Sequence, residues 1–355
     1  MSNGNTISHP ASGRGQYRAL VRRRQLMLAG FGIALLVSLC VDLALGPSNY
    51  SLEQVIRALL APDSVPVQVQ VVLWEIRMPI ALMAVVVGAA LSVAGAQMQT
   101  ILNNPLASPF TLGISAGASF GAALALAFGV TLIPAAIEYV VPINAFAVAM
   151  LAAFLIHLVS MRRGVTVQTI VLLGIALVFT FNALIALVQF FATQQALAAV
   201  VFWTMGSLTK ATWGKFWITL AVVAVVLPFF FRRAWALTAM RLGDAKAESF
   251  GIKIARLRLE TMILVSLLAA IPVAFVGTVG FVGLVGPHIA RMLIGEDQRF
   301  FLPASALSGA LILSASSVVS KSLIPGTIFP IGVVTSLVGI PFFISLILSN
   351  QRRSW

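Results

Sequence analysis

The decisive stretch of the chain is residues 78–137, which read MPIALMAVVVGAALSVAGAQMQTILNNPLASPFTLGISAGASFGAALALAFGVTLIPAAI. None of these 60 residues is Asp, Glu, Lys or Arg. A helix that spans a bilayer needs about 20 predominantly apolar residues, so this stretch holds two crossings with their connections. It is rich in Leu, Val, Ala and Gly and does not alternate between apolar and polar residues, which argues against an outer-membrane β-barrel.

The rest of the chain repeats this composition. Hydrophobic residues make up 60% of the 355 positions, charged residues only 9%, and the mean hydropathy is +1.02. An average soluble domain has about 25% charged residues, and a soluble surface could not cover so much apolar area. Five further stretches lack charged residues: 139–161, 164–209, 261–290, 300–320 and 322–351.

We therefore predict an all-α, polytopic membrane protein with ten transmembrane helices in a single domain, 26–350. A basic tail, 1–25, precedes this domain and is predicted to be disordered, and a short C-terminus, 351–355, follows it. No ordinary nucleotide-binding domain fits into the longest polar loop, about 232–260. The predicted crossings are roughly 26–46, 79–99, 112–130, 142–160, 166–191, 216–231, 260–277, 280–294, 301–319 and 330–348.

The distribution of basic residues predicts an orientation. The chain has 23 Lys and Arg against 10 Asp and Glu, and ten crossings place 18 of the 23 on the side of both termini. The positive-inside rule makes that side cytoplasmic in a multi-pass membrane protein. The net charge of +13 reflects scarce acids more than abundant bases, so we expect a lipid bilayer and no nucleic acid as partner. The five basic residues on the opposite side are Arg57, Arg77, Lys210, Lys215 and Lys321.

Ionisable side chains within the crossings are few. Asp42 and His157 lie near the ends of their predicted helices, where we expect them to reach the interface without a proton-relay role. The three histidines and the single Cys40 form no cluster that predicts a metal site. The sequence shows no nucleophile–base pair that would indicate a catalytic residue. It also contains no phosphate-binding Gly-x-x-x-x-Gly-Lys loop. The sequence therefore predicts that this chain is not an enzyme and holds no cofactor. If the chain is a transporter, the scarcity of ionisable residues within the crossings favours a partner protein as its source of energy.

Four segments are more specific than ordinary membrane helix. They are RMP (77–79) followed by VVVGAALSVAGAQMQ (85–99), NNPLASP (103–109) and LGISAGASFGA (112–122); FWTMGSL (202–208); RLGDAKAESFGI (241–252); and GFVGLVGPHIARMLIGEDQRFFLPASALSGA (280–310) followed by FPIGVVTSLVGIPFFISLIL (329–348). Small residues in the first segment predict close helix packing, because they let helix backbones approach each other in lipid.

In these segments the chain resembles the FecCD/vitamin B12-type permease family, the transmembrane subunits of type II ABC importers. The resemblance covers nearly all of the chain from about residue 26. It implies ten helices, a second permease subunit (identical or a paralogue), two ATP-binding subunits that hold ATP and Mg, and a periplasmic substrate-binding protein. It implies transport of a ferric siderophore, with haem or vitamin B12 as alternatives. An ion-coupled secondary transporter is the alternative from another class, although mid-membrane ionisable residues are scarce.

Residues 244–250 are predicted to form a short helix in the loop 232–260. Asp244 suits the positive end of a helix dipole, and Gly251 suits a helix stop. A charged helix of this kind can simply be a solvated face. The resemblance implies instead a coupling element that inserts into the ATP-binding subunit. The residues assigned to it are Arg241, Leu242, Gly243, Asp244, Ala247, Glu248 and Gly251.

Two further roles come from the resemblance. Asn103-Asn104-Pro105 is a helix stop, and a polar segment at this depth must be buried in protein or line a cavity. The family implies that Asn104 and Leu106, with Val167 and Gln168, close the cytoplasmic end of the pathway; a structural turn is the alternative. It also implies that Arg77 and Lys321 dock acidic residues of the binding protein, whereas Arg77 alone could be a snorkelling interfacial residue.

Overall fold

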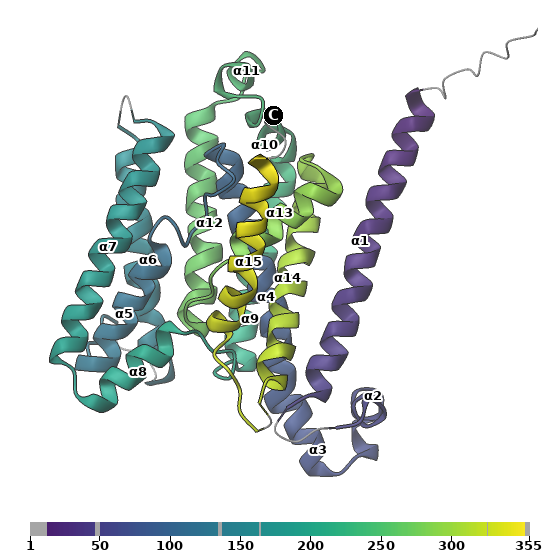
Figure 1. Cartoon of the computed structure of the whole chain (residues 1–355), viewed down its shortest axis with the longest axis vertical. Helices are drawn as coiled ribbons and strands as arrows, with labels where there is room; N and C mark the ends of the chain where they lie inside the picture. Colours follow the sequence, from purple (N-terminus) through teal and green to yellow (C-terminus); the bar gives the residue numbers. More distant parts are fainter. Residues whose placement is uncertain (1–12, 47–49, 134–136, 163–164, 325, 352–355) are drawn as a thin grey trace, which may run out of the picture.

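The computed structural model describes residues 13–46, 50–133, 137–162, 165–324 and 326–351. Within these ranges the chain is almost entirely helical (Figure 1), and the only β-type pairing is one isolated bridge between Ile324 and Thr327. The prediction of an all-α protein is confirmed. Helix formation follows from the long apolar stretches, because a backbone in lipid must satisfy its polar groups within its own segment.

Seven helices in the described ranges are long and apolar enough to cross a membrane. Three more apolar helices occupy the remaining predicted crossings, and the number of ten crossings stays a prediction. The seven are α1 (Gly13–Ala44), α4 (Met78–Ile101), α6 (Ile137–Ser160), α7 (Val167–Phe191), α9 (Trp213–Arg232), α12 (Ile254–Val276) and α14 (Gln298–Ser322). The other three are α5 (Ile114–Phe128), α13 (Val282–Ile294) and α15 (Ile331–Gln351).

Short helices close the two ends of the bundle. One end carries α2 (Leu52–Leu60) and α3 (Val67–Val71), and the opposite end carries α10 (Ala234–Met240) and α11 (Asp244–Ser249) (Figure 1). A π-helical turn, η2 (Val72–Arg77), joins α3 to α4, and a 3₁₀ turn, η1 (Pro62–Ser64), follows α2. Of the short helices, only α11 was predicted. The helix α8 (Gln194–Thr204) lies at the α2 end, beyond the end of α7.

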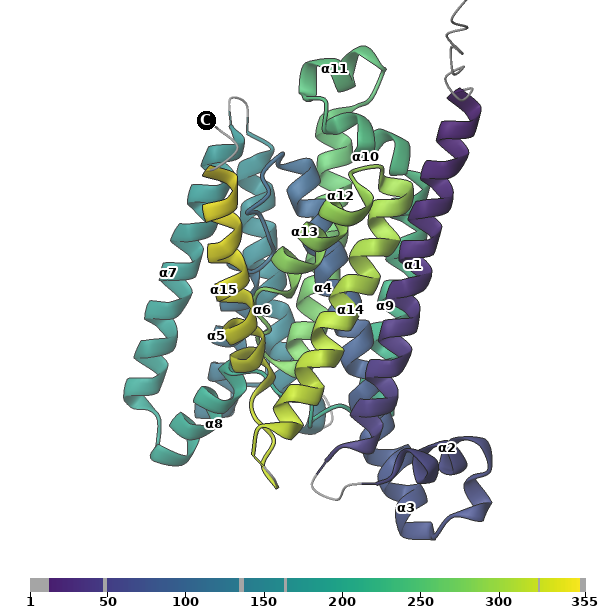
Figure 2. The ribbon, with the colours of Figure 1, turned by 45° about the vertical axis from the view of Figure 1, so that its right-hand side comes forward.

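The core of the bundle is built around α4, which is buried over most of its length and packs against α12, α13 and α14. A Cβ atom on Gly88 would collide with the backbone carbonyl of Gly309 in α14, and one on Gly95 would collide with that of Gly283 in α13. The tight packing predicted from small residues is confirmed here. In contrast, α1 leans against the outside of the bundle, mainly along α14 (Figure 2).

The first turn of α1 and the last turn of α15 lie at the same end of the bundle as α11 (Figure 2). This agrees with an even number of crossings. We refer to this end as the α11 end and to the other as the α2 end.

Candidate functional site

The α11 end carries the predicted coupling segment, and its local structure follows from two glycines. Gly243 and Gly251 flank α11 with φ angles of +97° and +79°, which L side chains rarely adopt. Gly251 N–H donates to the carbonyl of Glu248 at 2.8 Å, which closes the last turn. The predicted short helix with Asp244 in its first turn and a stop at Gly251 is confirmed.

The exposed face of α11 mixes acidic and apolar side chains. Leu242 is 57% exposed and Phe250 is 53% exposed, and Asp244 and Glu248 also face solvent. Ala247 is fully buried and belongs to the main hydrophobic core, so it anchors the helix from behind. The segment therefore forms a short projection with a fixed base and a face that is free to contact a partner.

Arg241 points away from that face and into an ion-pair cluster with Glu296. Glu296 lies between α13 and α14, and its carboxylate also pairs with the Arg291 Nε at 3.1 Å. Arg291 Nη2 in turn donates to Gln99 Oε1 of α4 at 2.8 Å. These contacts connect the coupling segment with α13 and α4.

A second set of contacts connects α11 with α12 and with the end of α4. The Asp244 carboxylate accepts from Arg258 Nη2 at 3.2 Å, and Arg258 Nε donates to the Ile101 carbonyl, the last residue of α4, at 3.0 Å. Glu296 and Arg258 escaped the sequence reasoning because Glu296 meets Arg241, and Arg258 meets the Ile101 carbonyl, far away along the chain. Displacement of α11 would therefore pull on α4, α12 and α13 through charged side chains as well as through the backbone.

The predicted gate has two parts, and the structure describes no hydrogen bond between them. Asn104 Oδ1 accepts from the Leu106 backbone N–H at 2.9 Å, which holds the turn after α4, and the Leu106 side chain is exposed. Val167 and Gln168 are the first two residues of α7, and Gln168 is exposed.

Beyond the turn, the loop after Asn104 becomes buried and reaches α7. A Cβ atom on Gly174 of α7 would lie 2.8 Å from the Leu112 Cα. Leu112 and Ser108 are both buried, as expected because a non-helical polar segment at membrane depth must be shielded from lipid by protein. The gate role itself stays a prediction.

The two predicted docking cations, Arg77 and Lys321, lie at the α2 end, and both are buried. The Lys321 ammonium lies 2.9 Å from the Asp42 Oδ1, with side chains that are 6% and 0% exposed. Arg77, which is 5% exposed, donates to the Leu43 and Ala44 carbonyls at 2.8 and 3.0 Å and covers the Tyr50 ring. Neither charge faces solvent in this conformation, so a docking role, which stays a prediction, requires these contacts to open.

This arrangement corrects the expectation that Asp42 snorkels to the interface. Its side chain is fully buried and joins α1 to α14 through Lys321. His157, by contrast, lies half-buried in the last turn of α6, close to the end of its helix as expected.

A cavity of about 360 Å³ lies between α5, α7 and α8. Four polar side chains line it from two of these helices: Ser115 and Ser119 of α5, and Asn182 and Gln189 of α7. The outer side of α7 is strongly exposed, with Phe179 71% accessible. The amides of Asn182 and Gln189, isolated within an apolar helix, were a signal that the sequence reasoning did not use.

Asp297, at the α11 end, stabilises the start of α14. Asp297 caps α14 by accepting from the Arg299 N–H at 3.1 Å, and its side chain also accepts from the Arg299 guanidinium at 2.7 and 3.0 Å. These hydrogen bonds, aided by the nearby Arg24, lower the pKa of Asp297. In the described part of the chain, no three His, Cys, Asp or Glu side chains gather as metal ligands would.

Comparison with known proteins identifies the family to which this chain belongs. The sequence matches the FecCD transport family over residues 34–349, which is most of the chain. The chain belongs to the FecCD transport family. It is 39% identical to an ABC transporter permease protein of Methanocaldococcus jannaschii, over 91% of this chain and 95% of that protein. It is 33% identical to the vitamin B12 import system permease protein BtuC of Serratia proteamaculans, over 92% of both.

The solved structures agree with the family assignment. An ABC transporter of metal-chelate type, in an inward-facing conformation, superposes with a TM-score of 0.80 at 29% identity over 92% of this chain and 99% of that chain. The protein is thus a polytopic ABC importer permease of the family that handles iron chelates, haem and vitamin B12. The ion-coupled alternative is not favoured.

Proposed function

We propose that this chain is the membrane subunit that moves a ferric siderophore from a periplasmic binding protein into the cytoplasm, by alternating access driven by separate ATPase subunits. The observation that carries the proposal is the α11 projection, with a fixed base and an exposed face that includes Leu242 and Glu248. Such a rigid projection can transmit closure of a partner to the helices beneath it. The ATPase subunits bind ATP and Mg, and this subunit needs no ATP site of its own.

The proposed orientation places the α11 end in the cytoplasm and the α2 end in the periplasm of a bacterial inner membrane. The excess of Lys and Arg at the α11 end supports it. The binding protein then meets the α2 end. The turn at Asn104 and Leu106 and the start of α7 at Val167 and Gln168 lie on the cytoplasmic side, where they would close the pathway.

A second permease subunit, identical or a paralogue, completes the pathway. The outer side of α7 exposes large apolar residues such as Phe179 and Leu187 beside the polar cavity at Asn182 and Gln189. A neighbouring subunit packed on α7 would shield the apolar residues and turn the cavity into one wall of a shared pathway. The wall would present amides and hydroxyls to a polar chelate.

The coupling assignment is tested by Glu248→Arg in the assembled transporter. We expect loss of binding-protein-stimulated ATPase activity and of transport, because the reversed charge faces the partner groove. The matched control is Arg18→Glu, an exposed charge reversal on α1 at the same end of the bundle but outside the coupling segment. Wild-type stimulation in Glu248→Arg, or equal loss in both variants, would refute the assignment.

The substrate is tested by uptake into proteoliposomes that contain the permease, its ATPase and its binding protein. Labelled ferric siderophore, hemin and cyanocobalamin are offered separately and in competition. We expect ATP-dependent uptake of the siderophore alone. Uptake of hemin or cobalamin instead would keep the importer assignment and replace the substrate, and uptake under an ion gradient without the ATPase would contradict the whole mechanism.

A further inference from the structure

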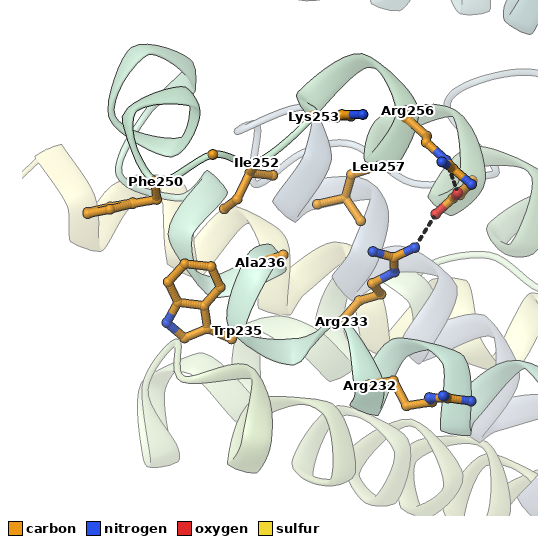
Figure 3. A pocket seen from close by; sticks show the side chains of 11 residues that line it. Arg232, Arg233, Trp235, Ala236, Phe250, Ile252, Lys253, Arg256 and Leu257 are labelled. Atoms are coloured by element: carbon orange, nitrogen blue, oxygen red, sulfur yellow. Dashed lines mark hydrogen bonds and ion pairs between the residues drawn. The ribbon is translucent and has the colours of Figure 1, made fainter.

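A cavity of about 460 Å³ lies at the α11 end, behind the coupling projection. It is formed by the C-terminal end of α9, by α10, and by the segment from Phe250 into the first turns of α12. Figure 3 shows Trp235 and Phe250 on one side of it and Arg233 and Arg256 on the other. Its volume is typical of small-ligand sites in proteins.

The cavity is strongly cationic. Four basic residues line it against one carboxylate, Glu260, which already pairs with Arg233 at 3.2 Å and with Arg256 at 2.8 Å. The other two cations, Arg232 and Lys253, make no ion pair within the described part of the chain. Their charges remain available to an anionic ligand.

The floor and one wall of the cavity are apolar. Leu257 is buried at its base, and Ala236 and Ile252 lie beside it. Trp235 is 65% exposed and meets the Phe250 ring at a centroid distance of 6.1 Å. A ligand that fits must therefore combine an anionic group with an apolar or amphipathic part.

The location of the cavity fixes its depth. Arg232 is the last residue of α9, and Arg256 lies in the first turn of α12, and both helices are candidate membrane spans. Just before Arg232, α9 exposes Val225 and Phe231, as expected of a lipid-facing surface. The cavity thus lies at the level of the lipid headgroups, where Trp and snorkelling Arg and Lys side chains accumulate.

We propose that this cavity binds the headgroup of an anionic phospholipid. Figure 3 shows Lys253 at one edge of the cavity and Arg232 at the other, so both attract the phosphodiester by their charge, while Trp235 packs against the glycerol and the first acyl carbons. Basic pockets at helix ends bind anionic headgroups by the same combination of charge and shape. The inference rests on the membrane placement of the chain and not on its substrate.

The test is native mass spectrometry of the delipidated full-length permease, titrated with phosphatidylglycerol or phosphatidylcholine. We expect tight binding of phosphatidylglycerol only, and about thirtyfold weaker binding to the double variant Arg232→Gln/Lys253→Gln. The matched control, Arg18→Gln/Arg162→Gln, removes two exposed cations that do not line the cavity and should bind as the wild type does. Equal binding of the two lipids, or wild-type binding by the double variant, would overturn the proposal.

A second readout places the lipid at Trp235. Brominated phosphatidylglycerol should quench more tryptophan fluorescence than brominated phosphatidylcholine, and this difference should disappear in Trp235→Phe. An unchanged difference in that variant would contradict the site. Repeating the titration with the ATPase subunit bound separates the lipid from a protein partner: retained lipid supports the proposal, and complete displacement would assign the cavity to the ATPase interface.

Discussion

The ion pairs at the two ends of the molecule differ in their exposure. At the α2 end, Asp42 and Lys321 are both buried where α1 meets α14. At the α11 end, Glu296 and Asp244 pair with arginines but keep much of their side chains in solvent. A buried charge that loses its partner is costly, whereas an exposed pair opens cheaply. The buried pair at the α2 end therefore resists opening, and the pairs at the α11 end open at a lower cost in free energy.

The largest expected effect is at the buried pair. Asp42→Ala should lower the free energy of unfolding by roughly 3–5 kcal/mol, because it leaves the Lys321 ammonium buried without its counter-charge. Thermal unfolding in detergent measures this. The control is Glu53→Ala, which removes an exposed ion pair with Arg57 at the same end and should cost less than about 1 kcal/mol. Similar costs for the two variants would remove the contrast between buried and exposed pairs.

The second-largest effect is expected at Glu296, and it concerns coupling to the ATPase more than stability. Glu296→Ala should cost roughly 1–3 kcal/mol, because it leaves the Arg241 and Arg291 side chains, only 18% and 16% exposed, close together without their shared carboxylate. It should also reduce binding-protein-stimulated ATPase activity several-fold, because the link from Arg241 to Arg291 is cut. Basal ATPase activity and binding-protein affinity serve as controls. Unchanged stimulation would mean that the coupling segment acts through the backbone alone.

The third effect is sensitive to salt. Asp244→Asn should destabilise the protein by roughly 0.2–1 kcal/mol, because its pair with Arg258 is partly exposed. Raising the ionic strength should shrink this difference, since mobile ions screen exposed charges. The cost of Asp42→Ala should stay nearly constant in the same titration. Equal salt dependence of the two variants would contradict the assigned burial.

The smallest effect is a pH dependence at Asp297. Its pKa is lowered below the ordinary 3.8, so its charge stabilises the folded protein above that value, and this contribution is lost as the pH falls through the folded pKa. Asp297→Asn keeps a good helix cap and should cost about 0.5 kcal/mol at pH 7. The melting temperatures of the two proteins should begin to converge as the pH falls below 3.8 and should meet only below the folded pKa of Asp297. A gap that persists there would assign the effect to packing.

Much of the fold could be predicted because the bilayer imposes long charge-free runs, such as 78–137. α11 could be predicted as well, because Asp244 and Gly251 are local signals at the start and end of a helix. The helices α2 and α8 could not, since both are too short to stand out as apolar segments, although Ser51 and Gln54 form a capping box at α2. Local signals lie within the reach of sequence reasoning.

The sequence reasoning failed mainly in predicting which charged side chains pair with each other. Asp42 looked like an interfacial residue because its partner, Lys321, lies 279 positions away. Glu296 looked unremarkable because it gains its role from Arg241 and Arg291 in space. Without a map of which helices touch, the sequence cannot tell whether an acidic side chain near a helix end reaches water or a buried ammonium.

The contacts at Gly88, Gly95, Gly283 and Gly309 have a consequence for mutational scanning. Because α4, α13 and α14 meet there backbone to backbone, nearly every substitution at Gly88 or Gly95 should be eliminated from a library before any transport selection is applied. Depletion at these positions would report assembly of the bundle and carry no information about cargo. The positions that should instead respond to a change of chelate are those that tolerate substitution and line the open cavity, such as Asn182 and Gln189.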